Sequence, residues 1–108
     1  LKLIDGEVVK FPTLEDGYVI PQIQWNTVNL NKKDSILFKD IDADPFMYFV
    51  HSFYVKPSQN NLVAYNANYG GLEYCCAIEY KNIFGVQFHP EKSSQNGLRL
   101  LKNFMDYV

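Results

Sequence analysis

The segment FMYFVHSFYV, residues 46–55, constrains the fold more than any other part of the chain. Apolar side chains occupy both alternations of this segment, and His51 interrupts it. Successive side chains of an extended chain point to opposite faces, so the pattern predicts a strand that is buried on both faces. A strand of this kind needs a packed layer on each side.

The rest of the chain predicts further strands. Apolar and β-branched runs bounded by turn residues occur at residues 1–11, 18–30, 62–66, 72–80 and 83–88, with a short element at 36–39. Pro21 indicates an edge strand or a break within the second of these runs. Many strands with little helix leave one face of a sheet poorly covered, and a missing portion of the domain would explain this.

One helix is predicted, at the C-terminus. After Ser93 the apolar residues recur at steps of three and four: Leu98, Leu101, Met105 and Val108, widened by Leu100 and Phe104. Ser93 or Ser94 can cap the free N–H groups at its start. Arg99 and Lys102 fall toward the solvated side of this helix.

Composition excludes several classes of function. Hydrophobic residues make up 47% of the chain, which favours a packed core over disorder. The net charge of -2 without a basic block argues against a nucleic-acid partner. No apolar run approaches the roughly 20 residues that cross a bilayer, so we expect a soluble protein without membrane contact. Adjacent Cys75 and Cys76 would form a strained disulfide, which indicates a reducing, cytoplasmic chain.

The sharpest chemical signal is GVQFHPEKS, residues 85–93, in which a strand delivers His89, Pro90 and Glu91 at its carboxyl end. If the chain stays extended through Pro90, the side chains of His89 and Glu91 project to the same side. The carboxylate can then accept an imidazole N–H and fix the tautomer. This is the base-and-orienter part of a nucleophilic triad. The alternative is a surface strand end with a chance His-Pro-Glu.

FGVQFHPEKS resembles the histidine motif of class I (triad) glutamine amidotransferases. LIDGEVV, Trp25-Asn26, YFVHS and the helix at 96–104 extend the resemblance to the glutaminase subunits of imidazole glycerol phosphate synthases. The resemblance implies a flavodoxin-like α/β fold, here a strand-rich C-terminal portion ending in one helix. It implies glutamine hydrolysis, a synthase (cyclase) subunit that receives the ammonia, and a hetero-oligomer. Residues 1–108 would be the C-terminal part of a single amidotransferase domain, without the Gly-x-Cys-x-Gly nucleophile elbow and the Gly-rich oxyanion strand.

The same resemblance assigns further roles. The backbone of Ser52 and Phe53 would help to hold glutamine. Trp25, Tyr48 and Lys92 would face the synthase subunit near the mouth of the ammonia passage. Core aromatics and a solvated lysine are the alternatives for these three residues. His51 reads either as a satisfied core histidine or as a functional one.

Two departures from the family pattern leave other functions open. Residues 21–26 read PQIQWN where the family usually has Pro-His-Met-Gly-Trp-Asn, which admits a related amidotransferase for nucleotide sugars or glycans. Absence of the nucleophile admits a non-catalytic binding domain. Cys75 or Cys76 could be the nucleophile, but neither has the flanking glycines of a sharp turn, so strand packing is favoured. The cysteine and histidine spacing does not suit a metal, and no cofactor is expected.

Overall fold

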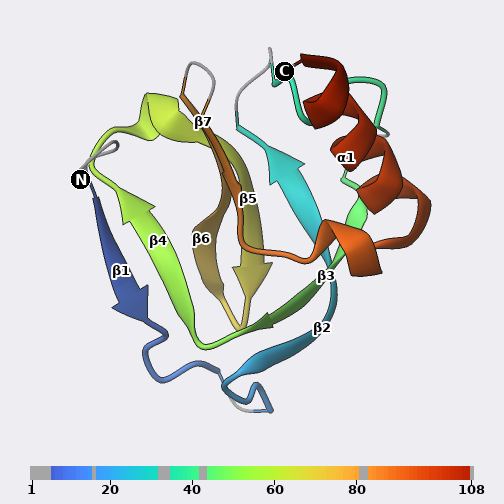
Figure 1. Cartoon of the computed structure of the whole chain (residues 1–108). Helices are drawn as coiled ribbons and strands as arrows, with labels where there is room; N and C mark the ends of the chain where they lie inside the picture. Colours follow the sequence, from blue (N-terminus) through green and yellow to red (C-terminus); the bar gives the residue numbers. More distant parts are fainter. Residues whose placement is uncertain (1–5, 16, 32–34, 42–43, 81–82, 108) are drawn as a thin grey trace.

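The computed structural model describes residues 6–15, 17–31, 35–41, 44–80 and 83–107. These residues form one sheet and a C-terminal α-helix (Figure 1). The strands are β1 (Gly6–Lys10), β2 (Gln22–Leu30), β3 (Phe46–His51), β4 (Phe53–Pro57), β5 (Val63–Tyr69), β6 (Leu72–Tyr80) and β7 (Ile83–Val86). The helices are the short 3-10 turns η1 (Asn60–Leu62) and η2 (Pro90–Lys92), and α1 (Ser94–Tyr107).

The strands follow the order β1-β4-β6-β5-β2-β3, and β7 pairs with β6 outside this path. Every pairing among the described strands is antiparallel. Helix α1 lies beside β3 and η2, away from β1 and β4 (Figure 1). This arrangement brings the chain after β7 next to β3, where the candidate site forms. No helix in the described part of the chain is long and apolar enough to cross a membrane.

The core is built from the inner faces of the strands. Val28, Met47 and Phe49 are fully buried there. Phe38, from the turn after residue 35, stacks on Tyr65 with ring centroids 3.6 Å apart. Burial of aromatic and aliphatic side chains of this size supplies most of the stabilising free energy of a small sheet.

The segment 46–55 departs from its prediction in two ways. It is not one strand: β3 ends at His51 and β4 begins at Phe53, with Ser52 between them. It is also buried on one face only, because Met47 and Phe49 are buried while Phe46 and Val50 are exposed. The expectation of burial on both faces is therefore wrong for this segment.

The other strand predictions differ from the structure mainly at their ends. β6 has the bounds expected for residues 72–80, whereas β5 continues to Tyr69 and β7 stops at Val86. The break expected at Pro21 is confirmed, because β2 begins at Gln22. Residues 36–39 form turns, and residues 1–5 of the first predicted strand lie outside the described residues.

Helix α1 is confirmed, but it buries only part of the predicted apolar stripe, at Leu100. Its buried residues are Gly97, Leu100 and Asn103. Leu98 and Met105, two members of the predicted stripe, are 63% and 72% exposed. Spacing alone identified apolar positions correctly, but it could not show which of them has a neighbouring element in this part of the chain.

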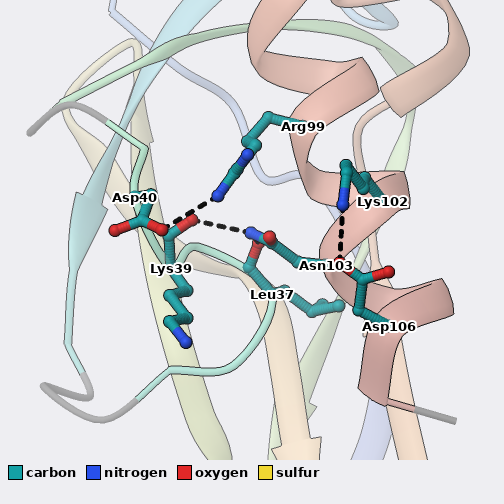
Figure 2. Close-up of polar contacts among 7 residues, drawn as sticks. All are labelled: Leu37, Lys39, Asp40, Arg99, Lys102, Asn103 and Asp106. Carbon is teal, nitrogen blue, oxygen red and sulfur yellow. Dashed lines mark hydrogen bonds and ion pairs between the residues drawn. The ribbon is translucent and has the colours of Figure 1, made fainter.

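Polar contacts fix α1 to the turn before β3 (Figure 2). The side-chain amide of Asn103 donates to the carbonyl oxygens of Leu37 and Lys39, both at 2.8 Å. Arg99 pairs with Asp40 at 2.9 Å and is partly exposed. Because a buried amide with two partners loses little on leaving water, Asn103 can take a place on the buried face. Lys102 lies on the solvated side as predicted, where it pairs with Asp106 (Figure 2).

Candidate active site

His89 and Glu91 form a hydrogen-bonded pair directly after β7. Nδ1 of His89 lies 2.8 Å from Oε1 of Glu91, and both side chains are partly exposed. A carboxylate can only accept, so Nδ1 carries the proton and Nε2 of His89 remains free to accept one. The backbone does not stay extended through Pro90, as the sequence pattern had suggested, because Pro90–Lys92 forms the turn η2. The turn brings the two side chains together all the same.

The charge state of Glu91 suits an orienting role. A hydrogen bond from its own backbone N–H, and then the hydrogen bond from His89, lower the pKa of the Glu91 carboxyl. The group is therefore ionised at neutral pH. An ionised carboxylate beside Nδ1 favours the tautomer with Nε2 unprotonated and stabilises the imidazolium that forms when Nε2 takes a proton.

Ser93 ties this turn to the sheet. It is 1% exposed, and its Oγ donates to the carbonyl oxygen of His89 at 2.7 Å and accepts the N–H of Tyr48 at 3.0 Å. The N–H of His89 in turn donates to the carbonyl oxygen of Tyr48 at 2.9 Å. The prediction that the Ser93 side chain caps the helix is wrong, since its hydroxyl is used here. The Ser93 backbone carbonyl accepts the N–H of Gly97 at 3.2 Å.

Gly97 allows α1 to pack closely against the same turn. A Cβ at this position would lie 1.9 Å from the carbonyl oxygen of Pro90 and 2.8 Å from Cβ of Ser93. Neither Ser93 nor Gly97 was identified as a site residue from sequence. A glycine inside a helical period is a usable signal of close approach. No feature of the sequence indicated that the Ser93 hydroxyl bonds the backbone of Tyr48 and His89.

Ser52 is the bend between β3 and β4, and Phe53 directly after it is the first residue of β4. The carbonyl oxygen of Ser52 accepts the N–H of Phe11 at 3.1 Å, and that of Phe53 lies 2.8 Å from Nδ1 of His51. The Phe53 side chain is exposed. The bend is therefore held from both sides, and its role in binding glutamine stays a prediction.

Trp25 and Tyr48 lie opposite each other on β2 and β3. Their rings contact edge to face, with centroids 5.8 Å apart. Trp25 is 46% exposed, so it is not a core aromatic in the described structure. Lys92 is exposed at the end of η2, whose preceding residue His89 bonds to the Tyr48 backbone. The three residues assigned to a partner interface thus come from neighbouring parts of the fold.

The two cysteines lie in β6 with free thiols. Burial raises the pKa of Cys75 to about 11 and raises the pKa of Cys76 well above its ordinary value. Both thiols are therefore protonated at neutral pH, and a protonated, buried thiol is a poor nucleophile. This supports strand packing as their role.

The sequence and the fold match a known class of proteins. The family model for class-I glutamine amidotransferases matches residues 18–107, and the chain belongs to this family. The HisH subunit of imidazole glycerol phosphate synthase from Chlorobaculum tepidum is 45% identical over 107 residues, covering 99% of this chain and 52% of that protein. The HisH protein from Acinetobacter baylyi is 44% identical over 108 residues, covering 99% and 51%. The chain thus spans about half the length of the curated relatives it matches.

Solved structures agree on the fold. A GMP synthase protein from Thermoplasma acidophilum superposes with a TM-score of 0.71 at 18% identity, covering 94% of this chain and 47% of that one. PurLQS from Thermotoga maritima gives a TM-score of 0.75 at 14% identity, covering 98% and 54%. The expected class I amidotransferase fold, as a strand-rich portion ending in one helix, is confirmed.

Proposed function

We propose that this chain supplies the general base and its orienter to a glutamine-hydrolysing site, and that it is the C-terminal part of a single amidotransferase domain. The observation that carries the proposal is the 2.8 Å contact between Nδ1 of His89 and Oε1 of Glu91. It leaves Nε2 as the free proton acceptor, which is the geometry that activates a nucleophile.

The chemistry assigns one proton path to His89. Nε2 takes the proton of a cysteine thiol from the half of the domain that carries the nucleophile, and the thiolate attacks the carboxamide carbon of glutamine. The imidazolium, stabilised by Glu91, then protonates the nitrogen of the tetrahedral intermediate, and ammonia departs as the C–N bond breaks to leave the glutamyl thioester. Water, deprotonated by Nε2, attacks the thioester and releases glutamate and the thiol. The sum is glutamine plus water giving glutamate plus ammonia.

The surface around β7 supports the assignment to part of a domain. β7 pairs with β6, and Gln87 N–H donates to the Cys76 carbonyl oxygen. Antiparallel ladders alternate, so the backbone groups of Phe84 and Val86 face the other edge of β7. No described strand pairs with that edge. An unpaired edge of this kind is a template for another strand.

Two apolar grooves flank β7. One, of about 180 Å³, lies between β7 and α1, and it is lined by Leu37, Phe84, Gly85, Val86, Pro90, Leu100, Leu101 and Phe104. The other, of about 120 Å³, lies toward β4 and β6. Exposed apolar grooves on both sides of an unpaired strand edge fit a strand and helices from the remainder of the domain. The relatives, about twice as long as this chain, have the length to supply them.

The partner proposed for the complete protein is a synthase subunit that receives the ammonia. The relatives are named as subunits of imidazole glycerol phosphate synthase, which favours histidine biosynthesis over amidation of nucleotide sugars or glycans. The exposed ring of Trp25 beside Tyr48 supports a protein interface there, because aromatic residues are enriched in such interfaces. Two free thiols are consistent with a cytoplasmic location.

The test uses this chain joined to its nucleophile half. His89→Asn keeps a donor near the position of Nδ1 and removes Nε2, so glutamate release should fall by at least about a thousandfold. Lys102→Ala, on the solvated side of α1, is the control and should keep normal turnover. Normal glutamate release from a folded His89→Asn protein would remove the basis for the proposal.

A further inference from the structure

A buried polar cluster lies behind the bend between β3 and β4, outside the pair that performs the acid-base chemistry. His51, Gln22 and Tyr74 are 8%, 0% and 3% exposed. Nε2 of His51 lies 3.0 Å from the Gln22 amide and 3.1 Å from the Tyr74 hydroxyl, and that hydroxyl lies 2.7 Å from the Gln22 amide. Its Nδ1 lies 2.8 Å from the carbonyl oxygen of Phe53. Both ring nitrogens of His51 are therefore engaged.

The partner of Nδ1 decides the tautomer. A backbone carbonyl only accepts, so the proton of a neutral His51 sits on Nδ1 and Nε2 accepts. Burial lowers the pKa of His51, which the hydrogen bond to Phe53 partly offsets and the charge of His89 lowers further. The imidazole is therefore neutral near pH 7.

Gln22 must then present a donor to this cluster. Its Oε1 faces Nε2 of His51, and two acceptors at 3.0 Å repel. Its Nε2 is buried and has no partner among the described residues. A half turn of the amide exchanges these two atoms. The amide N–H then donates to the hydroxyl oxygen of Tyr74, which donates its own proton to Nε2 of His51.

The backbone at the bend shows what this relay holds. Phe11 N–H bonds the carbonyl oxygen of Ser52, and Lys10 is opposite Phe53 in the next pair of the ladder. Alternate pairs exchange hydrogen bonds, so the N–H and carbonyl of Phe53 both point away from β1, to the side of His51. The Nδ1–H of His51 thus fixes the peptide groups of the bend that the proposed function assigns to glutamine.

We propose that His51, kept in its Nδ1–H tautomer by the relay from Gln22 through Tyr74, is a positioning residue that shapes the glutamine-binding bend at residues 52–53. The inference rests on the proposed function.

Two matched variants separate the two ring nitrogens, in this chain joined to its nucleophile half. The amide nitrogen of His51→Asn falls near Nδ1 and keeps the donor to Phe53. That of His51→Gln falls near Nε2 and leaves the Phe53 carbonyl without a donor. We expect the KM for glutamine to stay within about twofold in His51→Asn and to rise about tenfold in His51→Gln, with kcat changed less in both.

The spectroscopic arm uses ¹⁵N-histidine NMR of the same protein. His51, assigned by the signal lost in His51→Asn, should show a protonated Nδ1 and an unprotonated Nε2 at neutral pH. Gln22→Glu, isosteric but without a donor, should shift that pattern toward a protonated Nε2. An Nε2–H tautomer in the wild type, or equal KM increases in the two His51 variants, would overturn the proposal. Normal turnover in His89→Asn would instead sink the triad while leaving the His51 contrast intact.

Discussion

Replacing Ser93 by alanine tests how firmly the sheet holds the candidate base. The change removes the hydroxyl of a buried residue that serves two part-buried backbone groups. The Tyr48 N–H loses its acceptor at 3.0 Å, and the His89 carbonyl loses its donor at 2.7 Å but keeps the N–H of Lys92 at 3.0 Å. A buried donor without a partner costs about 1–3 kcal/mol, and the weakened second bond adds about 1 kcal/mol. We expect a loss of about 2–4 kcal/mol in the free energy of unfolding.

Denaturant unfolding and glutamate release from the complete protein measure the two consequences. The midpoint should fall, and kcat should fall by about tenfold or more, because a base displaced by even an ångström loses much of its effect. Ser94→Ala is the matched control, since Ser94 is the next residue, is exposed, and keeps its backbone φ of 58° with a Cβ in both forms. If Ser93→Ala and Ser94→Ala unfold at the same denaturant concentration and turn over glutamine equally, the Ser93 hydroxyl does not hold the turn of His89 to β3.

Three further changes address the same region. Gly97→Ala should destabilise the protein by at least about 3 kcal/mol, measured by thermal unfolding, because its Cβ would meet the Pro90 carbonyl oxygen at 1.9 Å; an unchanged Tm would contradict the close packing. Folding lowers the pKa of Glu91 from 4.5, so the ionised carboxylate stabilises the folded state above pH 4.5. This stability is lost as the pH falls through the lower folded pKa. In Glu91→Gln the free energy of unfolding should therefore depend less on pH in this acidic range. Lys92→Glu should weaken synthase binding in a titration and leave basal glutamate release unchanged, and lost basal turnover with normal binding would place Lys92 in the active site instead.

The position of the candidate base could be predicted from sequence because its determinants are local. His89 and Glu91 are two residues apart after a strand, and Pro90 restricts the backbone conformation of the residue before it. Few backbone conformations are therefore accessible that would keep the imidazole and the carboxylate apart. The local conformation was wrong in detail, since η2 replaces an extended segment. The turn η2 still brings Nδ1 of His89 to 2.8 Å from Oε1 of Glu91, so the predicted contact is present although the predicted conformation is not.

The surroundings of that pair could not be predicted, because they depend on residues far apart in the chain. Tyr48 and Ser93 are 45 residues apart, and Gln22 and Tyr74 are 52 apart. Strand patterns give each side chain a face but do not give the order of strands, and the order decides which faces meet. The exposed apolar residues of β3 and α1 were predicted to be buried for the same reason: the sequence pattern does not show which face has a neighbouring element.

The sequence by itself therefore determined the elements with strong periods, the amidotransferase motif and the contact between His89 and Glu91. Each depends on spacing within a few residues, where backbone geometry leaves little choice. The tertiary structure alone decided that Ser93 ties the turn to β3, that His51 engages both ring nitrogens, and that Trp25 lies exposed beside Tyr48. These contacts exist only once the sheet order brings distant strands together, because a hydrogen bond or ring contact extends over a few ångströms and sequence separation carries no information about it.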